Sequence, residues 1–143
     1  MDVLYTAEAL STGEGRSGKV QTSDGSFELD MAIPKEMGGS GAGTNPEQLF
    51  AAGYAACFHS ALQGVARAQK VKVTDSSVGG RVQIGPNGPN GQGGYQLAVV
   101  LEVVIPDMEH DQAQALADAA HQVCPYSNAT RGNIDVTITV SED

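Results

Sequence analysis

The sequence predicts an α+β fold, and three observations support this class. Segments typical of strands occur near the N-terminus and again in the second half of the chain. A long apolar segment with helical character separates these groups, and a shorter amphipathic one precedes the last strand. The strands form hairpins instead of alternating singly with helices, which favours antiparallel sheets of about six strands with two main helices. With 143 residues, the chain has the size of one domain, expected to span residues 1–143.

The N-terminal part is expected to contain strands at residues 3–10, 19–23 and 26–33. Asp24 and Gly25, between the second and third strands, form a dipeptide typical of tight hairpin turns. Residues 11–18, STGEGRSG, are predicted to be a glycine-rich loop that carries Arg16. Residues 34–43 are predicted to be a second loop.

A helix is predicted to begin at Asn45 and to end near Gln69. Asn45 is a favoured N-cap residue, Pro46 suits the first helical position, and Gln48 completes a capping box. Glu47 is favoured by the positive end of the helix dipole. The helix is uncharged except at its ends, so we expect it to be buried on nearly all sides. One broad stripe holds apolar and small residues, namely Leu49, Phe50, Gly53, Cys57, Ser60, Ala61 and Gly64.

The second half is expected to contain strands at residues 78–84, 95–105 and 134–140 and a helix at residues 109–123. The helix carries Leu116, Ala120 and Val123 on one apolar stripe. Cys124 lies at its C-terminal end, and Pro125 is expected to stop it and to begin a loop, PYSNATRG.

The acidic composition argues against nucleic acid as a partner. The chain has 17 Asp and Glu but 8 Lys and Arg, giving a formal net charge of −9, and such a surface repels phosphate backbones. The N-terminus lacks the pattern of a secretory signal, and the longest apolar run, residues 49–58, is about half of the ~20 residues that a membrane span needs. We therefore expect a soluble cytoplasmic protein that does not bind membranes.

In a reducing cytoplasm, the two cysteines are expected to be either inert buried residues or a working thiol pair. Cys57 lies in the apolar helix, where a cysteine often serves as a small core residue. Cys124 adjoins a polar loop, where we expect some access to solvent. One buried and one more mobile thiol suit a peroxidatic and a resolving cysteine. A reactive thiolate also needs a cation, for which Arg16 is the candidate; an exposed loop arginine is the alternative.

A metal site is a further alternative, because His59 and His121 lie near the cysteines in sequence and two Cys with two His match a zinc ligand count. Cys57 and His59, however, are about 200° apart around a helix and do not easily face one ion. His121 and Cys124 are three residues apart and could share a helix face, which also suits a Cys–His nucleophile pair. The competing interpretation of both histidines is a surface position.

Two long segments, GGSGAGTNPEQLFAAGYAACF and AAHQVCPYSNATRGNIDV, resemble the organic hydroperoxide resistance (Ohr) branch of the OsmC/Ohr family. The segments LYTAEAL, GEGRSG and VQIGPNG extend this resemblance over essentially the whole chain. The resemblance implies an OsmC/Ohr-like fold with one central buried helix in an intertwined homodimer. It also implies a thiol peroxidase with no bound cofactor: no metal, haem or flavin.

Matched position by position, the resemblance makes Cys57 the peroxidatic cysteine and Cys124 the resolving cysteine, which would form a Cys57–Cys124 disulfide. Arg16 would stabilise the thiolate and the peroxide, and Glu47 would orient Arg16. The implied reaction reduces an organic hydroperoxide to an alcohol, with dihydrolipoyl groups of a lipoylated protein as electron donor. The alternatives are a general OsmC-branch peroxidase and a non-enzymatic thiol redox sensor.

One geometric constraint follows from the helix itself. Glu47 and Cys57 are ten residues apart, which corresponds to about 15 Å along a straight helix. If both serve one site, either the helix breaks near Gly53 or the neighbouring subunit contributes some of the groups.

Overall fold

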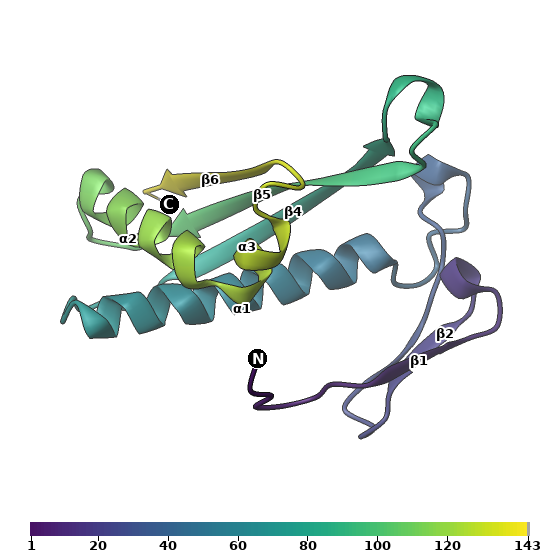
Figure 1. Cartoon of the computed structure of the whole chain (residues 1–143), viewed down its shortest axis with the longest axis horizontal. Coiled ribbons are helices and arrows are strands. Elements are labelled where there is room, and N and C mark those ends of the chain that lie inside the picture. Colours follow the sequence, from purple (N-terminus) through teal and green to yellow (C-terminus); the bar gives the residue numbers. More distant parts are fainter. Residues whose placement is uncertain (143) are drawn as a thin grey trace. The chain divides into compact units, whose positions relative to one another are not determined.

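The computed structural model describes residues 1–142, which fall into two compact units, Met1–Leu49 and the chain from Phe50 onward. Each unit holds one sheet of three strands, and the helices complete a mixed architecture (Figure 1). The predicted α+β class and the number of about six strands are confirmed. No helix in the described residues combines the length and the hydropathy that crossing a membrane requires.

The sheet of the first unit is antiparallel and has the order β1-β2-β3, with β1 (Ala9–Thr12), β2 (Lys19–Thr22) and β3 (Glu28–Asp30). The predicted turn is confirmed: Gly25 has a φ of +77°, and Asp24 accepts a hydrogen bond from the Ser26 backbone N–H, which helps lower the pKa of its carboxyl to about 2. The first strand begins later than predicted. Ala9 already pairs with Thr22, the last residue of β2, so residues before Ala9 have no β2 residue opposite them.

Helix α1 (Pro46–Ala68) begins at the predicted capping box. The Asn45 side chain accepts a hydrogen bond of 2.9 Å from the Gln48 backbone N–H, and the Gln48 side chain accepts one of 3.4 Å from the Asn45 backbone N–H. The helix continues through Gly53 as one element, so the break considered near that residue does not occur.

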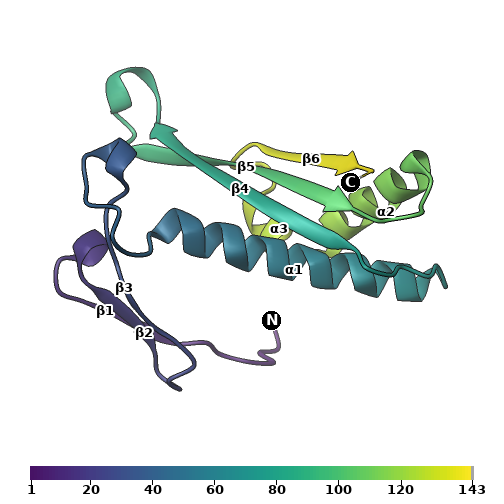
Figure 2. The same ribbon diagram turned by 180° about the vertical axis from the view of Figure 1, so that it is seen from behind.

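The sheet of the second unit has the order β4-β5-β6, with β4 (Ser77–Pro86), β5 (Tyr95–Val104) and β6 (Val136–Ser141). Strands β4 and β5 are antiparallel, as expected, but β6 runs parallel to β5 (Figure 2). The expected antiparallel pairing is therefore confirmed for the first sheet and for β4 with β5, and it is wrong for β6. Helices α2 (His110–Val123) and α3 (Pro125–Thr130) connect β5 to β6, and such a crossover returns the chain in the same direction.

Helices α1 and α2 share one core with a single face of this sheet. The register places Gly80, Leu101 and Ile138 in one row across the strands, and Leu101 is fully buried. Gly80 lets α1 approach closely, because a Cβ atom there would lie 2.6 Å from the Ala51 carbonyl oxygen. The buried helical residues of this core are Tyr54, Phe58, Leu62 and Ala66 of α1 and Ala113, Leu116, Ala117 and Ala120 of α2.

Two predictions about helix burial are wrong for the single chain. The buried residues of α1 follow each other at intervals of four and lie beside the predicted stripe, whereas Ala52, Ala56 and Ser60 are exposed. The apolar surface of α1 thus exceeds the face that the sheet and α2 cover. On α2, Leu116 and Ala120 are buried as predicted, but Val123 is 56% exposed because it lies beyond the edge of the core.

Candidate functional site: a thiol pair and an arginine–carboxylate pair

The two cysteines lie in contact in the second unit, although they are far apart in sequence. Both are free thiols, and the Cys124 S–H donates toward Cys57 Sγ across 3.7 Å. Cys57 lies on α1 and Cys124 lies where α2 ends and α3 begins. Cys57 and Cys124 are the two sulfur-containing residues predicted for the site. A disulfide in this site would therefore form between them.

The corner between α2 and α3 sets the position of Cys124. Its backbone is extended, its N–H donates to the Ala120 carbonyl at the end of α2, and its carbonyl accepts from the Asn128 N–H in α3. Pro125 is the first residue of α3, so the segment predicted as a loop begins with a short helix. A proline ends a helix that precedes it but also suits the first position of the next one.

The exposure of the two thiols is the reverse of what we expected. Cys124 is 0% exposed and belongs to the core, whereas Cys57 is partly exposed. Cys57 opens to a groove of about 560 Å³ whose other lining residues are mostly apolar or small, namely Ser60, Ala61, Gly64, Val65, Ala68, Val123 and Pro125. A reactant in this groove would therefore meet Cys57 first.

The surroundings of Cys57 in the second unit do not by themselves favour its thiolate. Burial raises the pKa of the Cys57 thiol, and a hydrogen bond from the Tyr126 backbone N–H only partly opposes this effect. Because the thiolate is the nucleophilic form, a reactive Cys57 needs further stabilisation of negative charge.

Arg16 and Glu47 form a two-pronged ion pair in the first unit. Arg16 Nη1 donates to Glu47 Oε2 at 2.9 Å, and Nη2 donates to Oε1 at 2.7 Å. Arg16 lies in a short 3₁₀ turn, Gly15–Ser17, and Glu47 lies in the first turn of α1. Hydrogen bonding from Arg16 holds the pKa of the Glu47 carboxyl below its usual value. The guanidinium group is thus fixed in orientation.

The two histidines bind hydroxyl groups. His59 Nε2 lies 2.9 Å from Ser76 Oγ, and His121 Nδ1 lies 2.8 Å from Ser127 Oγ. Within residues 1–142, no cluster of three or more potential metal ligands occurs. Burial is the main cause that lowers the pKa of His121, and the charge of Arg131 adds to it.

Sequence reasoning missed three polar residues next to the thiols: Tyr54, Ser127 and Thr130. Tyr54 is fully buried, and its hydroxyl binds the hydroxyl groups of the other two. The sequence offered one signal for them, a tyrosine within a largely apolar helix, because a buried tyrosine hydroxyl needs a hydrogen-bond partner.

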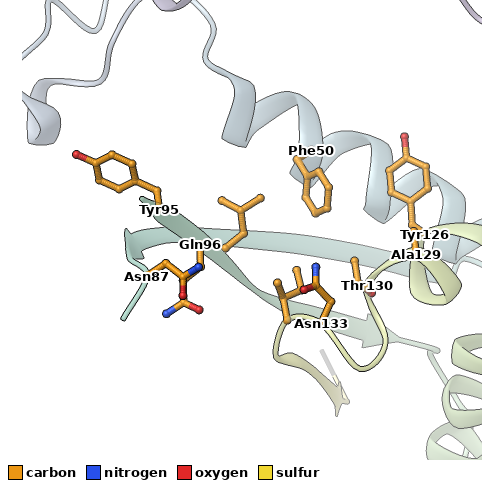
Figure 3. Close-up of a pocket in the computed structure, with 10 residues that line it drawn as sticks. Phe50, Asn87, Tyr95, Gln96, Tyr126, Ala129, Thr130 and Asn133 are labelled. Carbon is orange, nitrogen blue, oxygen red and sulfur yellow. The ribbon is translucent and has the colours of Figure 1, made fainter. Parts of the chain in front are cut away.

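A second cavity, of about 650 Å³, lies in the same unit but neither cysteine lines it. Figure 3 shows Phe50 and Tyr126 toward one end and Tyr95 at the other, with Thr130 and Asn133 below Phe50. The rings of Phe50 and Tyr126 are 6.1 Å apart, and Tyr54 packs on both. Two rings of this aromatic cluster, Phe50 and Tyr126, thus line the cavity, whereas the third, Tyr54, belongs to the buried core.

The sequence and the fold are similar to those of one group of proteins. Residues 38–139 match the family described as OsmC-like protein. The organic hydroperoxide resistance protein of Xanthomonas axonopodis pv. citri is 51% identical, over 97% of this chain and 96% of that protein. OhrB of Bacillus subtilis, an organic hydroperoxide resistance protein, is 44% identical over 94% and 96% of the two chains. The structure of an organic hydroperoxide resistance protein from Elizabethkingia anophelis matches with a TM-score of 0.92 and 48% identity over 100% of both chains.

Proposed function

The chain belongs to the OsmC/Ohr family as an organic hydroperoxide resistance type protein, and we propose that it is a Cys-based thiol peroxidase that reduces organic hydroperoxides to alcohols. The predicted family and fold are confirmed. The homodimer, the roles of the site residues and the electron donor are parts of the proposal.

The contact between Cys57 and Cys124 carries the proposal. The Cys57 thiolate attacks the terminal oxygen of the hydroperoxide, the O–O bond breaks, and the alkoxide takes a proton to leave as the alcohol. Cys57 becomes a sulfenic acid. Cys124 then forms an S–S bond with Cys57, and the displaced hydroxide leaves as water with the Cys124 proton. The net oxidation of two thiols to a disulfide balances the reduction of ROOH to ROH and H₂O.

Arg16 is proposed to stabilise the Cys57 thiolate and to bind the peroxide oxygens, with Glu47 holding the guanidinium group. The two-pronged pair supports this role, because it holds the planar guanidinium in a defined orientation. Burial raises the pKa of the Cys57 thiol, and a nearby cation would oppose this effect by stabilising the thiolate.

The groove beside Cys57 supports an organic substrate over hydrogen peroxide. Its lining is dominated by aliphatic and small residues, including Val65, Ala68 and Val123. An alkyl or aryl group of the hydroperoxide would gain about 0.8 kcal/mol per buried CH₂, which hydrogen peroxide cannot gain.

A dihydrolipoyl group is the proposed reductant, supplied by a lipoylated protein in the cytoplasm. Its two thiols would reduce the Cys57–Cys124 disulfide by two exchange steps and leave as the cyclic lipoyl disulfide. Cys124 is buried and Cys57 is partly exposed, so the first exchange is expected at Cys57.

A steady-state assay tests the proposal. The protein is given cumene hydroperoxide or hydrogen peroxide, each with dihydrolipoamide, glutathione or thioredoxin as the reductant. We expect many turnovers with cumene hydroperoxide and dihydrolipoamide and much slower turnover in the other combinations. Comparable rates on both peroxides would instead favour a general OsmC-branch peroxidase. A single stoichiometric oxidation without turnover would contradict an enzyme and support a redox sensor.

A further inference from the structure

A buried set of hydrogen bonds ties α1 to α3 beside the two thiols. Tyr54 Oη lies 2.9 Å from Ser127 Oγ and 3.0 Å from Thr130 Oγ1, and His121 Nδ1 lies 2.8 Å from Ser127 Oγ. Tyr54 and Ser127 are fully buried, and Thr130 is 6% exposed. We refer to Tyr54, His121, Ser127 and Thr130 as the hydroxyl network.

The proton count fixes the direction of each bond in the hydroxyl network. Thr130 Oγ1 donates its proton to the Ser127 carbonyl oxygen, so it accepts the proton of Tyr54 Oη. Tyr54 Oη therefore accepts from Ser127 Oγ, and Ser127 Oγ accepts from the Nδ1–H of His121. Donation runs from His121 through Ser127 and Tyr54 to Thr130. In this order, each hydroxyl oxygen accepts a proton from the preceding residue, so the loss of one donor leaves the next oxygen without that hydrogen bond.

The hydroxyl network connects the two backbones that carry the thiols. Tyr54 precedes Cys57 by three residues on α1, and Ser127 follows Cys124 by three residues in α3. Cys124 itself is completely buried, so the placement of its corner determines where its sulfur points. The Tyr54 hydroxyl adds two buried hydrogen bonds to the contacts that Cys124 and the Tyr126 backbone N–H make with Cys57 on α1.

We propose that the hydroxyl network positions Cys124 for disulfide closure, a role that rests on the proposed thiol peroxidase function. Closure must shorten the sulfur–sulfur distance from 3.7 Å to about 2.05 Å, so a small displacement of the corner changes the approach of the two atoms. The Cys124 sulfur forms the new bond while the S–O bond of the Cys57 sulfenic acid breaks, and the hydroxide leaves as water with the Cys124 proton. The members of the network are positioning residues, and the first oxidation of Cys57 does not depend on them.

Slow closure has a chemical consequence. A Cys57 sulfenic acid that waits can react with a second hydroperoxide molecule and become a sulfinic acid, which Cys124 does not reverse. The hydroxyl network would thereby decide how much peroxide the protein tolerates before it is inactivated.

Closure can be measured without any peroxide. 5,5′-Dithiobis(2-nitrobenzoate) converts the more exposed Cys57 into a mixed disulfide, and attack by Cys124 then releases a second thionitrobenzoate anion and a proton. Tyr54→Phe removes one hydroxyl and keeps the ring. We expect Tyr54→Phe to slow this second release about tenfold, which corresponds to the loss of one or two net hydrogen bonds in a buried site. The rate of the first release should stay within about twofold of wild type.

Ser76→Ala is the matched control. Ser76 Oγ also joins α1 to another segment, through His59 and Gln63, but that segment does not carry Cys124. We expect wild-type closure from Ser76→Ala even where its unfolding midpoint falls as far as that of Tyr54→Phe. Equal slowing by the two variants would overturn the proposal, because it would show a general loss of rigidity.

His121 gives a second test that does not alter the buried tyrosine. His121→Ala removes the first donor, whereas His121→Asn keeps an N–H donor of similar reach. We expect slow closure in His121→Ala and closure near the wild-type rate in His121→Asn. Wild-type closure in both Tyr54→Phe and His121→Ala would refute the role of the network.

The same variants are then treated with increasing cumene hydroperoxide, and sulfinic acid at Cys57 is measured by mass spectrometry. Tyr54→Phe should reach half oxidation to sulfinic acid at about one tenth of the wild-type peroxide concentration. If wild type fails to reduce peroxide while closure depends on the network as expected, the proposed function fails but the positioning role stands. If wild type turns over and Tyr54→Phe accumulates no extra sulfinic acid, the positioning role fails.

Discussion

The Cys124 sulfur lies 3.7 Å from the Cys57 sulfur while Cys124 is fully buried and Cys57 is partly exposed. This arrangement separates the tasks of the two thiols. In the proposed mechanism, a peroxide or an external thiol reaches the partly exposed Cys57, whereas Cys124 reacts only with the oxidised form of Cys57. The burial of Cys124 limits its direct oxidation, which agrees with the proposed order of the two steps.

We expect Cys57→Ser to abolish peroxide reduction, because serine supplies no thiolate. Cys124→Ser should consume the first equivalent of cumene hydroperoxide at a rate close to wild type and then accumulate sulfenic or sulfinic acid at Cys57. Rapid-mixing consumption assays and intact-protein mass measure both effects. Equal rates of first oxidation in wild type and Cys57→Ser would remove Cys57 from the mechanism.

Substitutions of Arg16 separate its charge from its shape. Arg16→Lys keeps the charge but loses the two-pronged bond to Glu47, so it should retain a partly lowered Cys57 pKa and lose more of the peroxide rate. Arg16→Ala should raise the pKa of the Cys57 thiol further, because the thiolate loses its cationic partner. The measurement is a thiolate titration by absorbance at 240 nm. Identical titrations for wild type and both variants would contradict the proposed role.

The ion pair of Arg16 and Glu47 also predicts a pH dependence of stability. The pKa of folded Glu47 is lowered, so its contribution is fully present above the usual glutamate pKa, near 4.5, and is lost as the pH falls through the folded value. Glu47→Gln should therefore lower the free energy of unfolding at pH 7, by about 0.5–1 kcal/mol since Arg16 is partly exposed. Urea unfolding at pH 7 and at pH 3 tests this, and a difference from wild type that grows toward pH 3 would contradict it.

Gly80 tests the close packing of α1 on β4. Gly80→Ala places a Cβ atom 2.6 Å from the Ala51 carbonyl oxygen, so the helix must shift, at a cost of about 1–3 kcal/mol in unfolding free energy. Gly79→Ala is the control: its Cβ would meet nothing closer than Glu102 atoms at 3.8 Å. Chemical unfolding should show a clear loss for Gly80→Ala and little change for Gly79→Ala. Equal stability of the two variants would mean that the helix and strand are not held at this distance.

The sequence predicts local features of this fold better than it predicts their partners. The capping box at Asn45 and the turn at Asp24 depend on neighbouring residues, and both are confirmed. The parallel pairing of β6 depends on the path through α2 and α3, which the alternation of its residues does not contain. Pro125 was ambiguous because proline suits both the end of one helix and the start of the next.

The same difference between local features and distant partners applies to the candidate site. The motif resemblance identified Cys57 and Cys124, and the structure brings their sulfur atoms together. Their relative burial was predicted in the wrong order, because exposure depends on how the corner of α2 and α3 packs on α1. The Tyr54 hydroxyl was missed for the same reason: its partners follow it by more than seventy residues.

The unbroken α1 leads to the last prediction, that each site combines groups from two subunits of a homodimer. Glu47 and Cys57 lie on one continuous helix, about 15 Å apart along its axis, a span that a carboxylate side chain does not bridge. With the helix break excluded, a site that uses both residues requires the Arg16–Glu47 pair of one subunit to serve Cys57 of the other. The exposed small residues Ala52, Ala56 and Ser60 on α1 allow a close approach of a second copy.

Mixing two inactive variants tests this arrangement. Glu47→Ala and Cys57→Ser subunits are unfolded together, refolded as an equal mixture, and assayed with cumene hydroperoxide and dihydrolipoamide. A mixed dimer would contain one site with an intact Cys57 from one subunit and an intact Glu47 from the other. Because half of the dimers are mixed and each has one such site, we expect about a quarter of wild-type activity. Each variant refolded alone is the control. Activity no higher than that of the controls would place all groups of a site in one subunit, and a protein that sediments as a monomer while active would rule out the dimer.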